Sequence, residues 1–167
     1  MPDATRRVIA FLIAIGVFGL DRWTKWLVET QLNVYDTRTV IPGFFNIVRS
    51  GNPGVAFGMF SDSSSQMHTL VLIGLSIVAI GLLFAMLWRI ERLDGFSAIG
   101  LALIFGGAMG NVYDRVHAGS VTDFLDFYAG TYHWYTFNVA DTSICVGAGL
   151  LILSMVKSQR KHEVSAL

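Results

Sequence analysis

Residues 69–88 read TLVLIGLSIVAIGLLFAMLW, a run of twenty residues with no charged side chain. A helix of this length is about 30 Å long, which matches the hydrocarbon thickness of a bilayer. The whole chain shares this character, because 53% of its 167 residues are hydrophobic and only 14% are charged. Soluble domains carry about 25% charged residues. The chain has too little charge to cover a water-facing surface, so we predict an integral membrane protein.

Three further apolar segments complete the predicted bundle. The first follows Arg6 and Arg7 and ends near Trp23 and Trp26, which are typical of a membrane interface. The last contains Asp141, the only carboxylate well inside an apolar span. We expect one integral membrane domain over residues 1–167, with helices at about 7–29, 69–88, 96–112 and 137–156.

Basic residues predict the orientation of the four helices. They precede the first helix, lie between the second and third, and follow the fourth: Arg6, Arg7, Arg89, Arg92, Lys157, Arg160 and Lys161. Positive charge accumulates on the cytoplasmic side. Both termini are therefore expected in the cytoplasm, and residues 30–68 and 114–136 are expected outside.

The first outer connection is too long for an unstructured loop. Residues 39–41 and 44–48 predict short strands around a Pro42-Gly43 turn, and residues 55–60 predict a second extended piece before a polar loop at 61–66. The expected fold class is an all-α membrane protein of four transmembrane helices. A small extracytoplasmic β-sheet, at about residues 34–60, is expected on its outer face.

Composition and missing motifs exclude several kinds of function. The net charge of +0 gives no indication of nucleic-acid binding, and one cysteine excludes an internal disulfide framework. The four histidines and Cys145 lack a zinc-site spacing, and no His-Glu-x-x-His or Gly-x-Ser-x-Gly motif is present. Cys145 is expected to be a buried, inert thiol within the fourth helix. No metal or cofactor is expected.

Ionisable groups near the spans need a partner or a function. Asp21 and Lys25 are four residues apart, which predicts a salt bridge at the interfacial end of the first helix. A functional role for Asp21 is equally consistent with the sequence. Asn138 and Asp141 share a face at the start of the fourth helix, where Asp141 is either a helix cap or a buried acid that requires a partner.

A second acid follows the third helix. Residues 121–127, VTDFLDF, alternate acidic with apolar residues, and such surroundings raise the pKa of a carboxyl group. A solvated interfacial loop is the alternative interpretation. Asp123 and Asp126 both remain candidates for a catalytic role here, and Asp123 is the natural partner for Asp141.

Amides and a guanidinium lie near these acids in the sequence. Asn111 and Arg115 share a helix face, with Asp114 beside it. On the outer side, Arg115 would suit stabilising a buried carboxylate or holding a substrate carbonyl. Asn52 opens an Asn-Pro-Gly stretch that, taken alone, predicts only a turn.

Two close carboxylates share one proton and titrate as a unit. The ionised member can take a proton from water while the protonated member donates to the scissile amide. Intramembrane acids also relay protons or bind ions in transporters. The spacing alone therefore leaves a peptidase and a small ion-coupled transporter equally open, with a structural scaffold as a third alternative.

Five sequence blocks together resemble the lipoprotein signal peptidase (signal peptidase II) family. They occur in the family's order and cover nearly the whole chain: DRWTK at 21–25, NPGVAF at 52–57, GGAMGNVYDR at 106–115, VTDF at 121–124 and FNVAD at 137–141. Each block is weak alone, but five in order are specific. Pro53 departs from the family pattern and removes a backbone donor beside Asn52, which affects the local turn.

The resemblance implies an aspartyl endopeptidase of the bacterial cytoplasmic (inner) membrane, with its active site near the periplasmic face. Asp123 and Asp141 match the catalytic pair, and Asp126 lies outside the motif. Six residues match the family's lining or supporting positions: Asn52, Asn111, Arg115, Asn138, Asp21 and Asp114. The implied substrates are prolipoproteins with a diacylglyceryl-modified cysteine, cut just before that cysteine. The family also implies contact with membrane lipid, inhibition by globomycin-type peptides and a monomeric enzyme.

Overall fold

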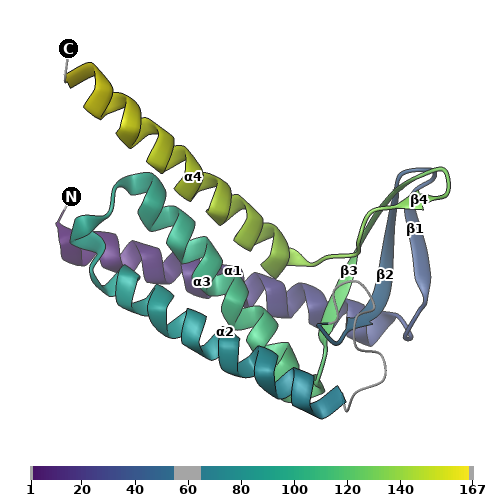
Figure 1. The fold of residues 1–167 in the computed structure, drawn as a ribbon. Helices are drawn as coiled ribbons and strands as arrows, with labels where there is room; N and C mark the ends of the chain where they lie inside the picture. Colours follow the sequence, from purple (N-terminus) through teal and green to yellow (C-terminus); the bar gives the residue numbers. More distant parts are fainter. Residues whose placement is uncertain (1, 55–64, 166–167) are drawn as a thin grey trace.

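A computed structural model describes residues 2–54 and 65–165. Four long helices make up most of this part of the chain: α1 (Asp3–Gln31), α2 (Ser65–Trp88), α3 (Gly95–Ala118) and α4 (Val139–Ser165). A short 3-10 helix, η2 (Ile90–Arg92), links α2 to α3. Both termini and this link lie at one end of the bundle, and the β-strands lie at the other (Figure 1).

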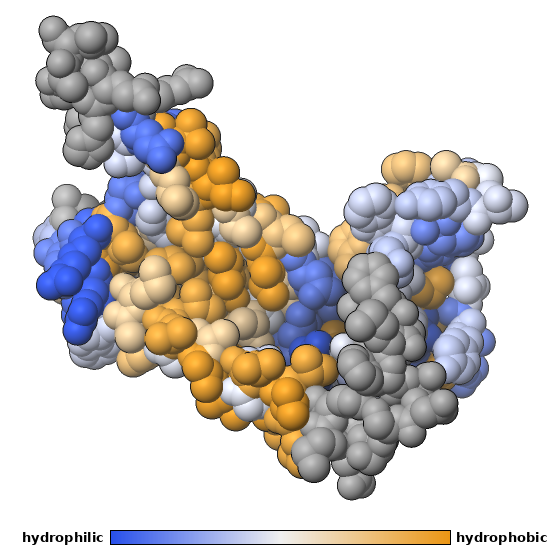
Figure 2. Space-filling model, in the orientation of Figure 1, coloured by the Kyte–Doolittle hydropathy of each residue, from blue (hydrophilic) through white to orange (hydrophobic). Residues whose placement is uncertain are grey.

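The helices present an apolar surface that suits a bilayer. Within residues 2–54 and 65–165, three segments are long and apolar enough to cross a membrane: Leu70–Trp88, Gly95–Ala118 and Val139–Gln159. In Figure 2 an apolar band covers the helices and is bounded by polar surface at both ends. Large side chains of α2, such as Leu75 at 65% and Val78 at 63% exposure, face outward with no protein partner to cover them. An exposed apolar surface of this extent indicates a membrane protein.

Helix α3 lies at the centre of the bundle because its glycines allow two neighbours to approach. A Cβ at Gly106 would lie 2.5 Å from the Ala14 carbonyl oxygen of α1. A Cβ at Gly107 would lie 2.5 Å from the Ala140 carbonyl oxygen of α4. Small residues allow this close packing in membranes. The close spacing between α1, α3 and α4 therefore depends on glycine, which has no side chain, at positions 106 and 107.

A four-stranded antiparallel sheet closes one end of the bundle, in the order β1-β2-β3-β4. Its strands are β1 (Thr37–Ile41), β2 (Phe45–Asn52), β3 (Val121–Ala129) and β4 (Tyr132–His133). The predicted hairpin around Gly43 is present, and Gly43 has φ +78. The β region expected at about residues 34–60 leaves out β3, which pairs with β2 along most of its length. The alternation in residues 121–127 is the period of a strand.

Several predicted boundaries also differ from the structure. The third helix continues past 112 to Ala118, so Asp114 and Arg115 are helical, and Gly119 then ends α3 with φ +72. Helix α4 runs to Ser165 rather than 156. Cys145 is exposed on α4 and was wrongly expected to be buried. The extended piece expected at 55–60 lies outside the described residues.

Candidate active site

Asp123 of β3 and Asp141 at the start of α4 meet on either side of Asn138. The Asn138 side-chain amide donates to Asp123 Oδ1 over 2.7 Å. The Asn138 side-chain oxygen accepts from the Asp141 backbone N–H over 2.9 Å. Asn138 is fully buried, and Asp123 is 2% exposed. One buried carboxamide therefore links the strand that carries one acid to the helix that carries the other.

The same contacts explain why α4 begins at this position. Asn138 precedes the helix, and its oxygen satisfies a free N–H of the first turn, as an N-cap does. Asp141 reciprocates, since its Oδ2 accepts from the Asn138 backbone N–H over 3.3 Å. This reciprocal pair has the geometry of a capping box. Of the two interpretations that the sequence offered for Asp141, the helix cap is present, and the side chain is half-buried rather than fully buried.

Two further amides donate to the oxygen of each acid that Asn138 does not contact. Asn52, at the end of β2, donates to Asp123 Oδ2 over 3.0 Å. Asn111 of α3 donates to Asp141 Oδ1 over 2.8 Å. Strand pairing supports the first contact, because Ser50 of β2 lies opposite Asp123. The structure thus brings all three predicted asparagines to the two predicted acids.

The environment changes the protonation of Asp123. Burial raises the pKa of its carboxyl group to about 6, and the nearby charge of Asp141 adds to this rise. The hydrogen bonds from Asn52 and Asn138 and the charge of Lys25 oppose it. Asp123 therefore exchanges its proton near neutral pH, which suits general acid–base chemistry.

Arg115 lies on α3, one turn beyond Asn111. Its guanidinium donates to the Asn111 backbone oxygen over 3.1 Å and is within electrostatic reach of Asp141 and Asp123. Its Nε is buried and has no hydrogen-bond partner within residues 2–54 and 65–165. The structure places Arg115 beside both acids, as the sequence predicted.

A layer of buried charge lies against the asparagines. Lys25 and Asp21 of α1 are both fully buried and are 2.8 Å apart. The predicted pairing is present, and both groups are buried inside the protein. Lys25 also lies 2.7 Å from Asp114 Oδ2 and donates to Asn111 Oδ1 over 3.2 Å. Asp21 Oδ1 accepts from the Ala140 backbone N–H over 2.9 Å, so α1 also caps α4.

Sequence reasoning missed Arg22, and it missed the contacts of Lys25 with Asp114 and Asn111. Arg22 pairs with Asp114 and lies 3.8 Å from Glu29. Glu29 in turn accepts from the Thr122 hydroxyl over 2.7 Å, next to Asp123. The spacing of Asp21, Arg22, Lys25 and Glu29 around one helix was visible in the sequence. Their convergence on α3 and β3 depends on how the elements pack.

Asp126 lies at a different part of the sheet. Its carboxylate accepts from the Asn46 side-chain amide over 2.8 Å and lies 2.8 Å from Nδ1 of His133. It is 4% exposed, while His133 is half-exposed. These contacts fasten β2 and β4 to β3 and account for the burial of Asp126. The structure separates Asp126 from the asparagines that hold Asp123 and Asp141.

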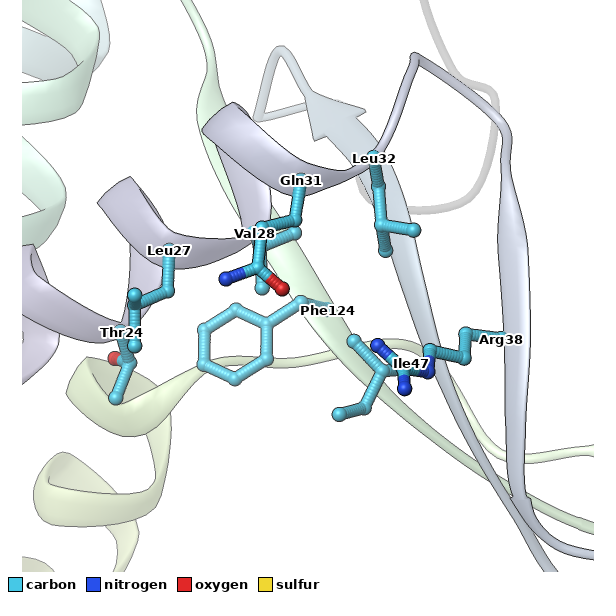
Figure 3. A pocket seen from close by; sticks show the side chains of 8 residues that line it. All are labelled: Thr24, Leu27, Val28, Gln31, Leu32, Arg38, Ile47 and Phe124. Atoms are coloured by element: carbon cyan, nitrogen blue, oxygen red, sulfur yellow. The ribbon is translucent and has the colours of Figure 1, made fainter.

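Two cavities flank α1 at the sheet end. One, of about 240 Å³, lies between the end of α1 and the sheet, with Phe124, Ile47 and Arg38 at its wall (Figure 3). The other, of about 420 Å³, is lined by charged and polar groups that include Arg22, Glu29 and Asp114. Phe124 and Thr122 alternate with Asp123 along β3, so both cavities adjoin the face of β3 opposite that acid.

Comparisons with known proteins agree with this geometry. The family model described as "Signal peptidase (SPase) II" matches residues 13–157. A "Lipoprotein signal peptidase" of Solibacter usitatus is 53% identical over 161 residues, covering 96% of this chain and 97% of the relative. One of Geobacter sulfurreducens is 40% identical over 149 residues, covering 89% and 92%. A solved structure described as a bacterial membrane enzyme at 1.9 Å resolution superposes with a TM-score of 0.78. It is 32% identical and covers 89% of this chain and 93% of its own.

The fold and the family match define a membrane aspartic endopeptidase. The chain belongs to the signal peptidase II family, whose members remove the signal peptide from prolipoproteins. It is accordingly a bacterial membrane protease that acts on prolipoproteins.

Proposed function

We propose that Asp123 and Asp141 are the catalytic pair of this peptidase. The observation that carries the proposal is the Asn138 bridge, which gives one hydrogen bond to Asp123 and exchanges two with Asp141. Acids held this way can share a proton without a metal or a covalent intermediate. The ionised member takes a proton from the attacking water, and the protonated member donates to the scissile amide.

Three amides and a guanidinium support this chemistry. Asn52, Asn111 and Asn138 give one hydrogen bond to each of the four carboxylate oxygens. Each oxygen keeps a second lone pair that can accept from water or substrate. Arg115, within electrostatic reach of both acids, keeps a buried Nε donor that is unpaired within the described residues, and such a donor suits the carbonyl oxygen of the scissile bond. Asp21 and Asp114 support the site without contacting the catalytic pair. Asp21 accepts from the first turn of α4, and Asp114 pairs with Arg22 and Lys25 of α1.

The proposed topology has four membrane spans in a single integral domain. Helix α1 is the span added to the three in α2, α3 and α4. The charged residues in the second half of α1 face α3 and the sheet rather than lipid: Asp21, Arg22, Lys25 and Glu29. The ends that carry Arg7, Arg89 and Arg92 face the cytoplasm of the inner membrane, together with both termini. The sheet and the acids then lie at the periplasmic face.

This position suits a lipid-tailed substrate. The acyl chains of a diacylglyceryl-modified cysteine can remain in the outer leaflet while the peptide bond before it reaches the acids at the interface. The enzyme acts as a monomer in contact with membrane lipid and is inhibited by globomycin-type cyclic peptides that occupy the same site. An ion-coupled transporter is less consistent with acids at one membrane face, because transporter sites lie near the midplane.

The test is cleavage of a diacylglyceryl-modified prolipoprotein by purified protein in detergent, followed by gel mobility. Asp123→Asn and Asp141→Asn should each insert and fold but lose at least about a thousandfold in rate, because each removes a proton donor or acceptor. Asp126→Asn is the matched control, a buried acid of the same strand, and should cut at close to the parent rate. Normal cleavage by either of the first two variants would refute the assignment.

A further inference from the structure

Lys25 is a fully buried cation that the proposed chemistry does not use. Its ammonium contacts three oxygens, those of Asp21 at 2.8 Å, Asp114 at 2.7 Å and Asn111 at 3.2 Å. A salt bridge that only anchors a helix end needs neither complete burial nor a neutral third partner. The contact with Asn111 therefore needs a separate explanation.

Asn111 can act on Asp141 only in one orientation of its carboxamide. Its NH₂ group donates to Asp141 Oδ1 over 2.8 Å, while its oxygen faces Lys25. A rotated carboxamide would turn its oxygen toward a carboxylate and its NH₂ toward an ammonium group, which has donors only. Both contacts would then be repulsive. The Asn138 amide also faces the Asn111 oxygen, at 3.4 Å, and favours the same orientation.

We propose that Lys25 is a positioning residue for the aspartate pair: it holds the Asn111 carboxamide so that Asn111 donates to Asp141. This inference rests on the proposed function of the two aspartates. Asp21 and Asp114 hold the ammonium from the other side, and Arg22 shares the charge of Asp114. The chain of contacts thus runs from Lys25 on α1 through Asn111 on α3 to Asp141 on α4. Lys25 acts through Asn111 rather than by direct contact with Asp123 or Asp141.

A second observation supports this role. The charge of Lys25 opposes the rise in the pKa of Asp123 that burial produces. The other charged groups facing Asp123 are Asp141 from α4 and Arg115 from α3, while β2 contributes the neutral Asn52. Removing the Lys25 charge should therefore move the titration of Asp123 to higher pH.

The experiment introduces Lys25→Met into an Asp21→Asn background and compares the double variant with Asp21→Asn alone. The double variant loses one negative and one positive charge, so no carboxylate is left without its cation at position 21. The steady-state cleavage of a diacylglyceryl-modified prolipoprotein is measured for D21N and D21N/K25M, and again with N111L added to each. We expect K25M to lower kcat about a hundredfold where Asn111 is present. It should change kcat less than about threefold in the N111L background, because the group through which it acts is then absent.

The pH profile of kcat/KM provides a second readout. The titration near pH 6 should move to higher pH in D21N/K25M relative to D21N. Thermal unfolding shows whether each variant folds. If D21N/K25M does not fold, D21N/K25Q replaces it, because glutamine is neutral but keeps a hydrogen-bond donor. K25Q should still lower kcat more where Asn111 is present than in the N111L background.

Equal losses of kcat in the two backgrounds, or an unchanged pH profile, would show a merely structural role and overturn the inference. The aspartate assignment has its own test and can stand when this inference fails. Active Asp123→Asn or Asp141→Asn enzyme would instead overturn both.

Discussion

Replacing Gly107 with alanine should separate α3 from α4 and disable the enzyme without touching either acid. The added Cβ would lie 2.5 Å from the Ala140 carbonyl oxygen and 3.0 Å from Ile144 Cγ1. The first contact is about 0.9 Å short of an ordinary contact distance of 3.4 Å. The obstacle is backbone at the start of α4, which cannot rotate away as a side chain can, so the helices must move apart.

This displacement acts directly on the site. Asn111 is one turn beyond Gly107 on the same face, and its 2.8 Å hydrogen bond to Asp141 would stretch beyond hydrogen-bonding distance. We expect Gly107→Ala to destabilise the protein by about 1–3 kcal/mol, as overpacking does. The rate of prolipoprotein cleavage should fall about a hundredfold, as expected for a displacement near 1 Å.

The assay combines thermal unfolding in detergent with prolipoprotein cleavage at a temperature where both proteins are folded. Gly149→Ala is the matched control on α4, because a Cβ there meets nothing within 4 Å. It should keep full activity and gain about 0.5–1 kcal/mol from a better helix former. If Gly107→Ala behaves like Gly149→Ala in both measurements, the close approach of α3 and α4 does not position Asn111.

Three further predictions follow from the site. Because burial raises the pKa of Asp123 from 3.8 to about 6, the free energy of unfolding is highest where this side chain is protonated, below about pH 3.8. This contribution of Asp123 to the free energy of unfolding is lost as pH rises through about 6, a difference of about 3 kcal/mol. Asp123→Asn should therefore have a higher unfolding midpoint than the parent at pH 7.5 but not at pH 3.5; parallel midpoints across this range would contradict the role of burial. Asn138→Ala should slow cleavage about a hundredfold or more and cost about 1 kcal/mol as a lost helix cap, and near-normal kcat would show that the bridge is dispensable. Asp126→Asn should lower the free energy of unfolding by about 1 kcal/mol, because the charge-assisted contact with His133 is lost, while a large loss of kcat would mean that the wrong acid of β3 was assigned.

Local patterns predicted much of the fold because the bilayer imposes simple rules on sequence. An uncharged run of twenty residues has few alternatives to a spanning helix, and the turn at Gly43 needs a positive φ. Boundaries were less predictable where helices end in polar surroundings. Helix α3 continues to Ala118 because Asp114 and Arg115 find buried partners, which hydropathy cannot detect.

Strand β3 was missed for a related reason. Alternation over seven residues indicates a strand only if another strand is available to pair with it, and the β2 residues that pair with β3 lie 69 to 82 residues earlier in the chain. That pairing places Asp123 beneath Asn52, and no local signal reports it. The two interpretations of residues 121–127, loop or buried acid, were therefore not separable from the sequence.

By itself, the sequence determined that the chain belongs in a membrane, which ends carry positive charge, and which acids and amides are candidates for chemistry. These properties depend on composition and on spacing along one helix. Only the tertiary structure decided that Lys25 is buried against Asn111 and that Asp126 is held by Asn46 and His133. Both outcomes depend on contacts between α1, α3, β3 and α4, and the free energy of a buried charge is set by the neighbours that packing brings to it.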